Sequence, residues 1–272
     1  MRLRSIVAVD AVAGLDEALA APADAVLLTV AEASRPVAEL RAAVKAALAR
    51  AREAGKAGLV TVNHPRTQLL REDLEALVSA DLAGVLLPHT VEPQDVRDLA
   101  VLLREIEYGR GLEPGCVAAF PVLDTARGLL RAAEIAHAAP RVAGLVFDTQ
   151  AFATDTGART EEAGPRLAHA RGSVVAATRA HEGLPIVRGG ELELLQLAHT
   201  GFAGAILTGT RAVGAANMVF TPTAAEVDLA RAQVAAYAAA RAAGQSVGRV
   251  GEGVVDAHTE RKARQTLEQA GA

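Results

Sequence analysis

Short apolar runs alternate with longer amphipathic segments along most of the chain. The apolar runs are continuous instead of alternating with polar residues, which is the pattern of strands buried on both faces of a parallel sheet. The sequence predicts strands at residues 6–9, 25–30, 58–62, 84–87, 117–123, 142–147, 185–187 and 204–207.

The segments between these runs have helical spacing. Leu40, Val44 and Ala47 illustrate the i, i+4, i+7 stripe of one apolar helix face. Helices are expected at residues 37–54, 68–78, 93–107 and 125–138. Strands that are each followed by a helix predict a closed (β/α)8 TIM barrel. The alternative is an open dinucleotide-binding sheet, but residues 10–14 after the first strand contain one glycine instead of the expected glycine-rich motif.

The pattern changes after residue 220. Thr223 and Glu226 have the spacing of a capping box, and an Ala-rich helix is expected from there to about residue 243. A turn at residues 251–253 precedes a last helix at about 256–269. Because no change in composition marks a linker, the sequence predicts one domain, with a barrel at 1–220 and a C-terminal helical extension at 221–272.

Composition narrows the class of protein. Hydrophobic residues make up 51% of the 272 residues and the net charge is −4, with no basic stripe that carries aromatic side chains, so nucleic acid is not an expected partner. Neither a membrane span nor a signal peptide is visible, and a cytoplasmic location is predicted. The single cysteine, Cys116, excludes an internal disulfide and is expected at a buried strand position.

Polar side chains follow every predicted strand, and in this fold chemistry occurs at the carboxyl ends of the strands. These side chains are Asp10, Thr29, Glu32, Thr61, Asn63, His64, His89, Asp124, Asp148, Arg188 and Thr208.

Two of these residues suggest a metal site. Asp124 and Asp148 follow adjacent strands and are candidate ligands for Mg²⁺ or Mn²⁺, which favour carboxylate oxygens and water. The alternative is that each aspartate only caps the helix after it.

The other candidates are catalytic. His64 and His89 are candidate acids or bases near neutral pH, and Arg188 is a candidate partner for a substrate carboxylate. Alternatively, His64 is a turn residue before Pro65, and Arg188 pairs on the surface with Glu191 or Glu193.

Several stretches, taken in order, resemble the HpcH/HpaI aldolase and citrate lyase β-subunit family. They are Asp24-Ala25-Val26-Leu27-Leu28, Gly84-Val85-Leu86-Leu87-Pro88, Asp124-Thr125-Ala126-Arg127-Gly128-Leu129, residues 140–147, Asn217-Met218-Val219-Phe220-Thr221-Pro222 and Val254-Val255-Asp256-Ala257. The resemblance implies a barrel, commonly a homotrimer. It also implies Mg²⁺-dependent formation or cleavage of C–C bonds in 2-oxo acids or acyl-CoA thioesters.

The chain departs from the family at the positions that carry the chemistry. Thr61 replaces the arginine that binds the substrate carboxylate, His89 replaces a lysine, and Ala151 replaces the second metal-ligating aspartate. Asp124 stands at the first ligand position, and Asp148, three residues before Ala151, is a candidate replacement ligand. By position, Thr29, Thr61 and Asn63 are candidate substrate contacts.

Three functions therefore compete. One is a divergent C–C lyase that uses Mg²⁺ through Asp124 and Asp148, with Arg188 in place of the lost arginine. A second is a metal-free enzyme that uses His64 or His89 with Asp124 for acid–base chemistry. The third is a non-catalytic barrel that binds a ligand or a partner. No compact basic cluster for the phosphates of CoA is visible, although the fold can bring scattered arginines together.

Overall fold

The computed structural model describes residues 1–9, 13–31, 37–158, 167–190 and 193–271. The chain divides into two compact units, one from Leu3 to Asn217 and one from Met218 onward. Asp10, Glu32 and Glu191 lie outside the described residues.

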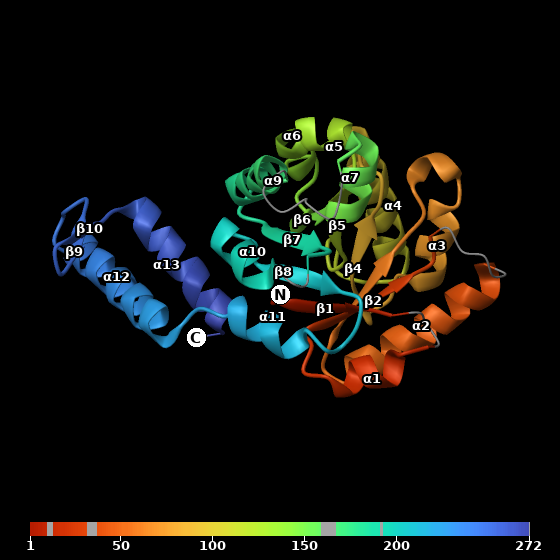
Figure 1. The fold of residues 1–272 in the computed structure, drawn as a ribbon, viewed down its shortest axis with the longest axis horizontal. Coiled ribbons are helices and arrows are strands. Elements are labelled where there is room, and N and C mark those ends of the chain that lie inside the picture. Colours follow the sequence, from red (N-terminus) through yellow and green to blue (C-terminus); the bar gives the residue numbers. More distant parts are fainter. Residues whose placement is uncertain (10–12, 32–36, 159–166, 191–192, 272) are drawn as a thin grey trace. The chain divides into compact units, whose positions relative to one another are not determined.

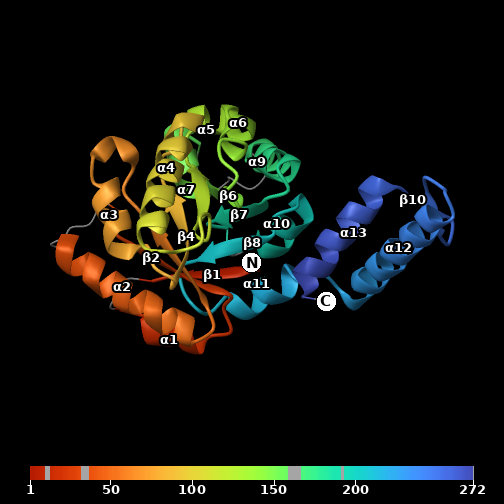
Figure 2. The same cartoon turned by 180° about the vertical axis from the view of Figure 1, so that it is seen from behind.

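The first unit is a closed barrel of parallel strands in chain order, from β1 to β8, as Figures 1 and 2 show from two sides. The strands are β1 (Ser5–Ala8), β2 (Ala25–Thr29), β3 (Ala57–Thr61), β4 (Leu82–Leu87), β5 (Ala118–Leu123), β6 (Gly144–Asp148), β7 (Leu184–Arg188) and β8 (Gly204–Leu207). The ring closes where Ile6 of β1 pairs with Ile206 of β8. This arrangement confirms the predicted (β/α)8 fold.

Helices surround the strands of this unit. They are α1 (Leu15–Ala20), α2 (Val37–Glu53), η1 (Pro65–Thr67), α3 (Leu70–Leu77), α4 (Pro93–Gly109), α5 (Ala126–Leu130), α6 (Ala132–Ala136), α7 (Thr149–Thr156), α9 (Ala168–Ala180), α10 (Leu194–Thr200) and α11 (Val213–Val219). The predicted helix at 125–138 is two short helices, because Arg131 leaves helical geometry with φ −112° and ψ 14°.

Apolar side chains fill the barrel. Leu27, Leu59, Leu86 and Phe120 lie in the central cluster, each at most 3% exposed. The backbone of Leu3 approaches β8 so closely that only glycine fits at position 204, because a Cβ on Gly204 would lie 1.8 Å from the carbonyl oxygen of Leu3. The interior is therefore a packed core, and the polar rim above it is where a substrate can bind.

Cys116 corrects one prediction. It is exposed and lies two residues before β5 begins at Ala118. The apolar run of the sequence extends past the strand into a loop, where the backbone N–H groups of Gly115 and Val117 donate to the carboxylate of Glu107.

The second unit holds α12 (Ala224–Ala242), the hairpin β9 (Gly248–Val250) and β10 (Gly253–Val255), and α13 (Ala257–Ala270). Thr223 and Glu226 form the predicted capping box. Asp256 caps α13 by accepting from the backbone N–H of Thr259 at 2.8 Å. Among the described residues, no helix is both long and apolar enough to cross a membrane.

Candidate active site

Three charged residues lie side by side at the carboxyl ends of β5, β6 and β7. The pairing of Leu123 with Phe147 places Asp124 beside Asp148, and Asp148 itself pairs with Arg188. The structure thus brings together the two predicted metal ligands and the predicted carboxylate-binding arginine, as expected for the rim of a parallel barrel.

Asp124 is the most buried of these charges, with 4% of the residue exposed. Its Oδ2 atom accepts from the backbone N–H of His89 at 2.9 Å and lies 2.9 Å from His89 Nδ1. Its Oδ1 atom is buried and has no hydrogen-bond partner among the described residues. Burial raises the pKa of Asp124, and the charge of Asp148 raises it further, whereas the backbone N–H and charge of His89 lower it. A buried carboxylate oxygen without a partner is energetically costly unless a ligand or cation meets it.

Asp124 does not cap the helix after it, contrary to one alternative. Thr125 is the N-cap of α5, and its side chain accepts from the backbone N–H of Gly128. The carboxylate of Asp124 is therefore not used as a helix cap and is available for contacts at the barrel rim.

His89 is held in an uncommon backbone conformation beside this carboxylate. Its φ is 51°, in the left-handed region that residues with a side chain rarely adopt. With Nδ1 donating to Asp124, the Nε2 atom carries the lone pair and can accept a proton. The side chain is 58% exposed. Strained residues of this kind concentrate at functional sites.

Asp148 has two partners. One oxygen accepts from the backbone N–H of Ala151 at 3.0 Å and caps α7, as one alternative predicts. The other oxygen lies 3.8 Å from Nε of Arg188, whose side chain is 44% exposed. Arg188 therefore pairs with Asp148, whereas Glu193 pairs with the buried Arg171 at 2.8 Å.

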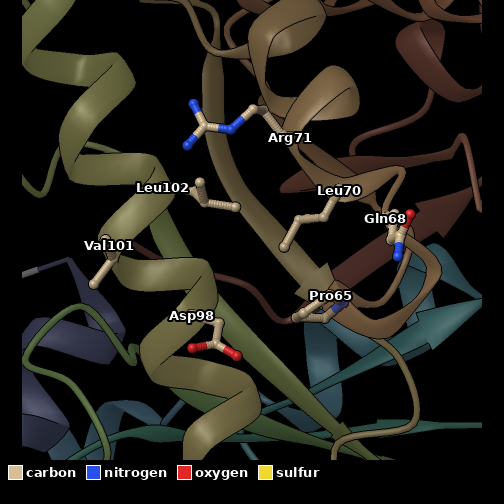
Figure 3. A pocket seen from close by; sticks show the side chains of 7 residues that line it. All are labelled: Pro65, Gln68, Leu70, Arg71, Asp98, Val101 and Leu102. Atoms are coloured by element: carbon tan, nitrogen blue, oxygen red, sulfur yellow. The ribbon is translucent and has the colours of Figure 1, made fainter.

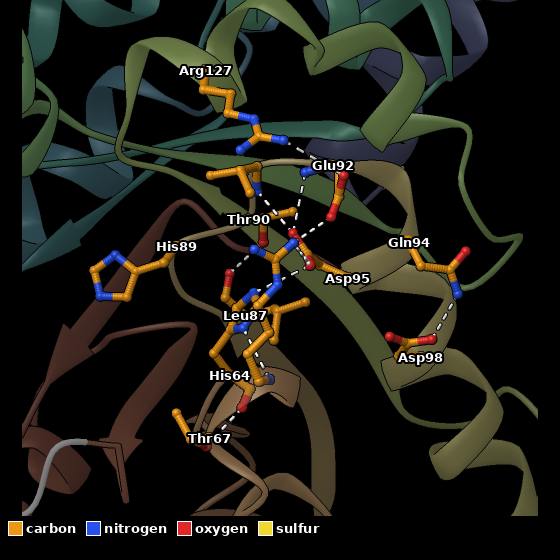
Figure 4. Close-up of polar contacts among 12 residues, drawn as sticks. His64, Thr67, Leu87, His89, Thr90, Glu92, Gln94, Asp95, Asp98 and Arg127 are labelled. Atoms are coloured by element: carbon orange, nitrogen blue, oxygen red, sulfur yellow. Dashed lines mark hydrogen bonds and ion pairs between the residues drawn. The ribbon is translucent and has the colours of Figure 1, made fainter.

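His64 belongs to a different network. Its Nδ1 accepts from the backbone N–H of Arg66 at 3.3 Å, which makes it the N-cap of η1 and supports its interpretation as a turn residue. Its Nε2 lies 3.5 Å from Oδ1 of Asp95 in α4. Burial lowers the pKa of the imidazole. Figure 4 shows His64 directed at this network, with the ring of His89 turned away from it.

The predicted substrate contacts at the end of β2 and at or after the end of β3 differ in their surroundings. Thr29 is exposed and pairs with Thr61, which is 8% exposed. Asn63 is 7% exposed and donates through both its backbone N–H and its Nδ2 to the buried carboxylate of Asp73. Asn63 therefore also anchors the loop after β3.

Thr149 is a candidate that the sequence reasoning missed. It follows Asp148 at the start of α7, is 9% exposed, and its hydroxyl has no hydrogen-bond partner among the described residues. The first N–H groups of a helix are suited to an anion. Its position directly after a strand end was the available signal.

A metal site is only partly preformed. Among the described residues, no group of three or more His, Cys, Asp or Glu side chains is placed to hold an ion. Mg²⁺ is commonly held by one or two carboxylates together with substrate oxygens and water. The unpartnered Oδ1 of Asp124 next to Asp148 fits an ion that binds together with a substrate.

A separate pocket lies on the outer side of the barrel, between η1, α3 and α4 (Figure 3). Pro65, Leu70 and Leu102 are among the residues that line it. Because its lining contains none of the charged rim residues, it is distinct from the candidate active site.

The protein is a (β/α)8 barrel with two aspartates and an arginine at the carboxyl ends of neighbouring strands. The model of the HpcH/HpaI aldolase/citrate lyase family matches residues 7–206, and the chain belongs to this family. A (3S)-malyl-CoA thioesterase of Cereibacter sphaeroides is 33% identical over 79% of this chain and 74% of its own. The citrate lyase subunit beta of Escherichia coli K12 is 31% identical over 78% of this chain and 73% of its own.

Solved structures agree on the fold. A citrate lyase from Burkholderia xenovorans has a TM-score of 0.76 at 18% identity and covers 100% of this chain and 92% of its own. A citrate lyase beta subunit from M. tuberculosis, in complex with oxaloacetate and magnesium, has a TM-score of 0.61 at 20% identity and covers 81% of this chain and 98% of its own.

Proposed function

We propose that this protein is a Mg²⁺-dependent carbon–carbon lyase that acts beside the carbonyl of a 2-oxo acid or an acyl-CoA thioester. The observation that carries the proposal is Oδ1 of Asp124 at the barrel rim, which is buried and has no hydrogen-bond partner among the described residues. Asp124 lies beside Asp148, which in turn pairs with Arg188. Family membership and the magnesium and oxaloacetate named for one solved relative support the same chemistry.

In this proposal the rim residues have different roles. Asp124 and Asp148 would hold Mg²⁺, which supplies a Lewis acid for negative charge that develops on a carbonyl oxygen. Arg188 binds the substrate carboxylate through its forked N–H groups and takes the place of the arginine that Thr61 replaces. The hydroxyl of Thr149 offers a further hydrogen bond to that carboxylate. His89, oriented by Asp124, moves a proton through Nε2.

The test is a calorimetric titration of metal-free protein with Mg²⁺ and with Mn²⁺, each in the presence and absence of oxaloacetate. Binding is expected only with the oxo acid present, since the protein supplies two carboxylates, and it should be lost in an Asp124→Ala variant. In an Arg188→Gln variant, oxaloacetate should bind about 1.5–3 kcal/mol more weakly, the range for a hydrogen bond to a charged group. Absence of metal binding under both conditions would refute the metal-dependent function.

A second candidate is metal-free acid–base catalysis by His89 and Asp124. The contact of 2.9 Å between His89 Nδ1 and Asp124 Oδ2 favours it, because it orients the imidazole and stabilises its protonated form. Turnover of an oxo acid or acyl-CoA that survives EDTA and is lost in a His89→Gln variant would support this candidate over the first.

A further inference from the structure

Two histidines from neighbouring helices contact each other at the end of the barrel opposite the candidate active site. His137 follows α6 and His181 follows α9, and these two helices pack side by side, as Figures 1 and 2 show. The ring centroids are 4.7 Å apart. In the chain, these residues precede β6 and β7, whereas the charged rim residues come at the carboxyl ends of the strands. We call His137 and His181 the histidine pair.

The backbone holds both histidines in the same position on their helices. Each is a C-cap, with φ −91° and ψ 5° for His137 and φ −98° and ψ 9° for His181. After His181, the N–H of Gly183 donates to the carbonyl oxygen of Thr178 at 3.0 Å and fixes the turn. The last carbonyl groups of a helix carry partial negative charge, so the histidine pair lies where a cation is favoured.

The ring of His137 makes the hydrogen bond that is typical of a metal-ligating histidine. Its Nδ1 lies 2.9 Å from the carbonyl oxygen of Ala133. Because a carbonyl oxygen only accepts, this contact puts the proton on Nδ1 and leaves the lone pair on Nε2. Metal-ligating histidines almost always donate their other ring N–H in this way. Among the described residues, the ring of His181 has no hydrogen-bond partner, so its nitrogens are available to an ion.

The spacing of the two rings suits one shared ion. Two imidazole nitrogens that bind a tetrahedral ion at about 2.0–2.1 Å have ring centres roughly 5 Å apart, close to the observed 4.7 Å. The angle of 64° between the ring planes also suits it, because the nitrogens of parallel stacked rings cannot meet at one ion. His137 is exposed and His181 is half-buried, so an ion can reach the histidine pair from solvent.

The chemistry of the histidine pair selects a different ion from the one proposed for the rim. Imidazole is a ligand for Zn²⁺, Cu²⁺ and Ni²⁺, whereas Mg²⁺ favours oxygen. The guanidinium of Arg179, two residues before His181, donates to the carbonyl oxygen of Gly201 at 3.2 Å and so has a partner at the end of α10.

We propose that His137 and His181 form a binding site for one divalent transition-metal ion of the class of Zn²⁺, with water in the remaining coordination positions. The bound ion links the carboxyl ends of α6 and α9. Residues at this end of a (β/α)8 barrel serve stability, so the ion stabilises the fold and takes no part in the reaction at the rim. The proposal is independent of the proposed function.

The test is a calorimetric titration of metal-free protein with Zn²⁺ in the presence of excess Mg²⁺, which imidazole binds poorly. We expect one Zn²⁺ ion per chain at this site. Binding should be at least roughly 10-fold weaker in His137→Gln and in His181→Gln, since even the loss of an outer-shell partner usually costs that much. The double variant should bind about as weakly as either single variant, because each substitution already removes the shared site.

Thermal unfolding gives a second measurement. Zn²⁺ should raise the melting temperature of the wild type more than that of either variant, since an ion that binds the folded chain stabilises it. His169→Gln is the matched control, because His169 is an exposed histidine near the start of α9, and this variant should bind Zn²⁺ as the wild type does. Urea unfolding in EDTA checks that the variants fold as the wild type does.

Equal Zn²⁺ affinity in the wild type and in either single variant would overturn the proposal. Losses of affinity that add in the double variant would do the same, because they would mean two separate sites. A stoichiometry of one ion per two chains would overturn the assignment to a site within one chain.

Discussion

Asp124 meets His89 through a single carboxylate oxygen, which accepts from the backbone N–H at 2.9 Å and lies 2.9 Å from Nδ1. The other oxygen is buried without a partner among the described residues. One half of the carboxylate is thus used to orient the imidazole, and the other half is left for a ligand. Such an arrangement costs stability in the free protein and is typical of a functional site.

An Asp124→Asn substitution should separate stability from function. Burial raises the pKa of Asp124 above its ordinary value of 3.8, so the folded state retains this proton at a pH at which the unfolded chain has lost it. The stability of the wild type relative to Asp124→Asn should therefore be highest below pH 3.8 and fall as the pH rises through the raised pKa.

Thermal unfolding of both proteins from pH 3.5 to 7 measures this difference. The variant should lose Mg²⁺-dependent binding of oxaloacetate and be at least as stable as the wild type at neutral pH, because the asparagine carbonyl still accepts from His89. A variant that is less stable at every pH would contradict the interpretation of Asp124 as a ligand-binding carboxylate.

Two substitutions of Asp148 separate its contribution as the N-cap of α7 from the contribution of its negative charge to metal binding. Asn is as good an N-cap as Asp, so Asp148→Asn should keep the stability of α7 but weaken Mg²⁺ binding. Asp148→Ala removes both and should cost a further ~0.5–2 kcal/mol of unfolding free energy. Urea unfolding together with metal titration measures the two effects. Unchanged metal affinity in Asp148→Asn would exclude Asp148 as a ligand.

His64 should make the protein sensitive to acid. Burial lowers the pKa of His64 below its ordinary value of 6.5, so the unfolded chain takes up this proton at a higher pH than the folded chain. The stabilisation is present above pH 6.5 and is lost as the pH falls through 6.5 toward the lowered pKa. Asn at position 64 keeps a cap and cannot titrate. The melting temperature of the wild type should therefore fall more than that of His64→Asn between pH 7.5 and 5. An equal fall in both proteins would contradict the assignment of this acid sensitivity to His64.

Glu107 should be among the most destabilising sites to change. Its side chain is 0% exposed and binds Arg141 at 2.8 Å as well as the N–H groups of Gly115 and Val117. Glu107→Ala leaves the guanidinium of Arg141 without its carboxylate partner and should cost about 3–5 kcal/mol, as for other broken buried ion pairs. Urea unfolding checks the value. Glu105 lies on α4, as Glu107 does, and forms an exposed pair with Arg71 of α3, so Glu105→Ala is the control and should leave the midpoint unchanged.

The sequence alone determined the barrel and its rim. Continuous apolar runs and the helical stripe of Leu40, Val44 and Ala47 are patterns of local periodicity. Such patterns can be recognised in the sequence without knowledge of the tertiary contacts. The capping box at Thr223 is local in the same sense. The candidate residues Asp124, Asp148 and Arg188 followed from the rule that chemistry lies at the carboxyl ends of the strands.

The tertiary structure decided what these side chains contact. The exposure of Cys116, the division of the helix at Arg131 and the two roles of Asp148 depend on where each element ends in space. Glu92 contacts Arg66, Arg127 and Arg131, three residues that no local pattern connects to it. Hydrophobic periodicity selects an architecture because it acts along the chain, whereas hydrogen bonds and ion pairs form between side chains that meet only after the barrel has closed.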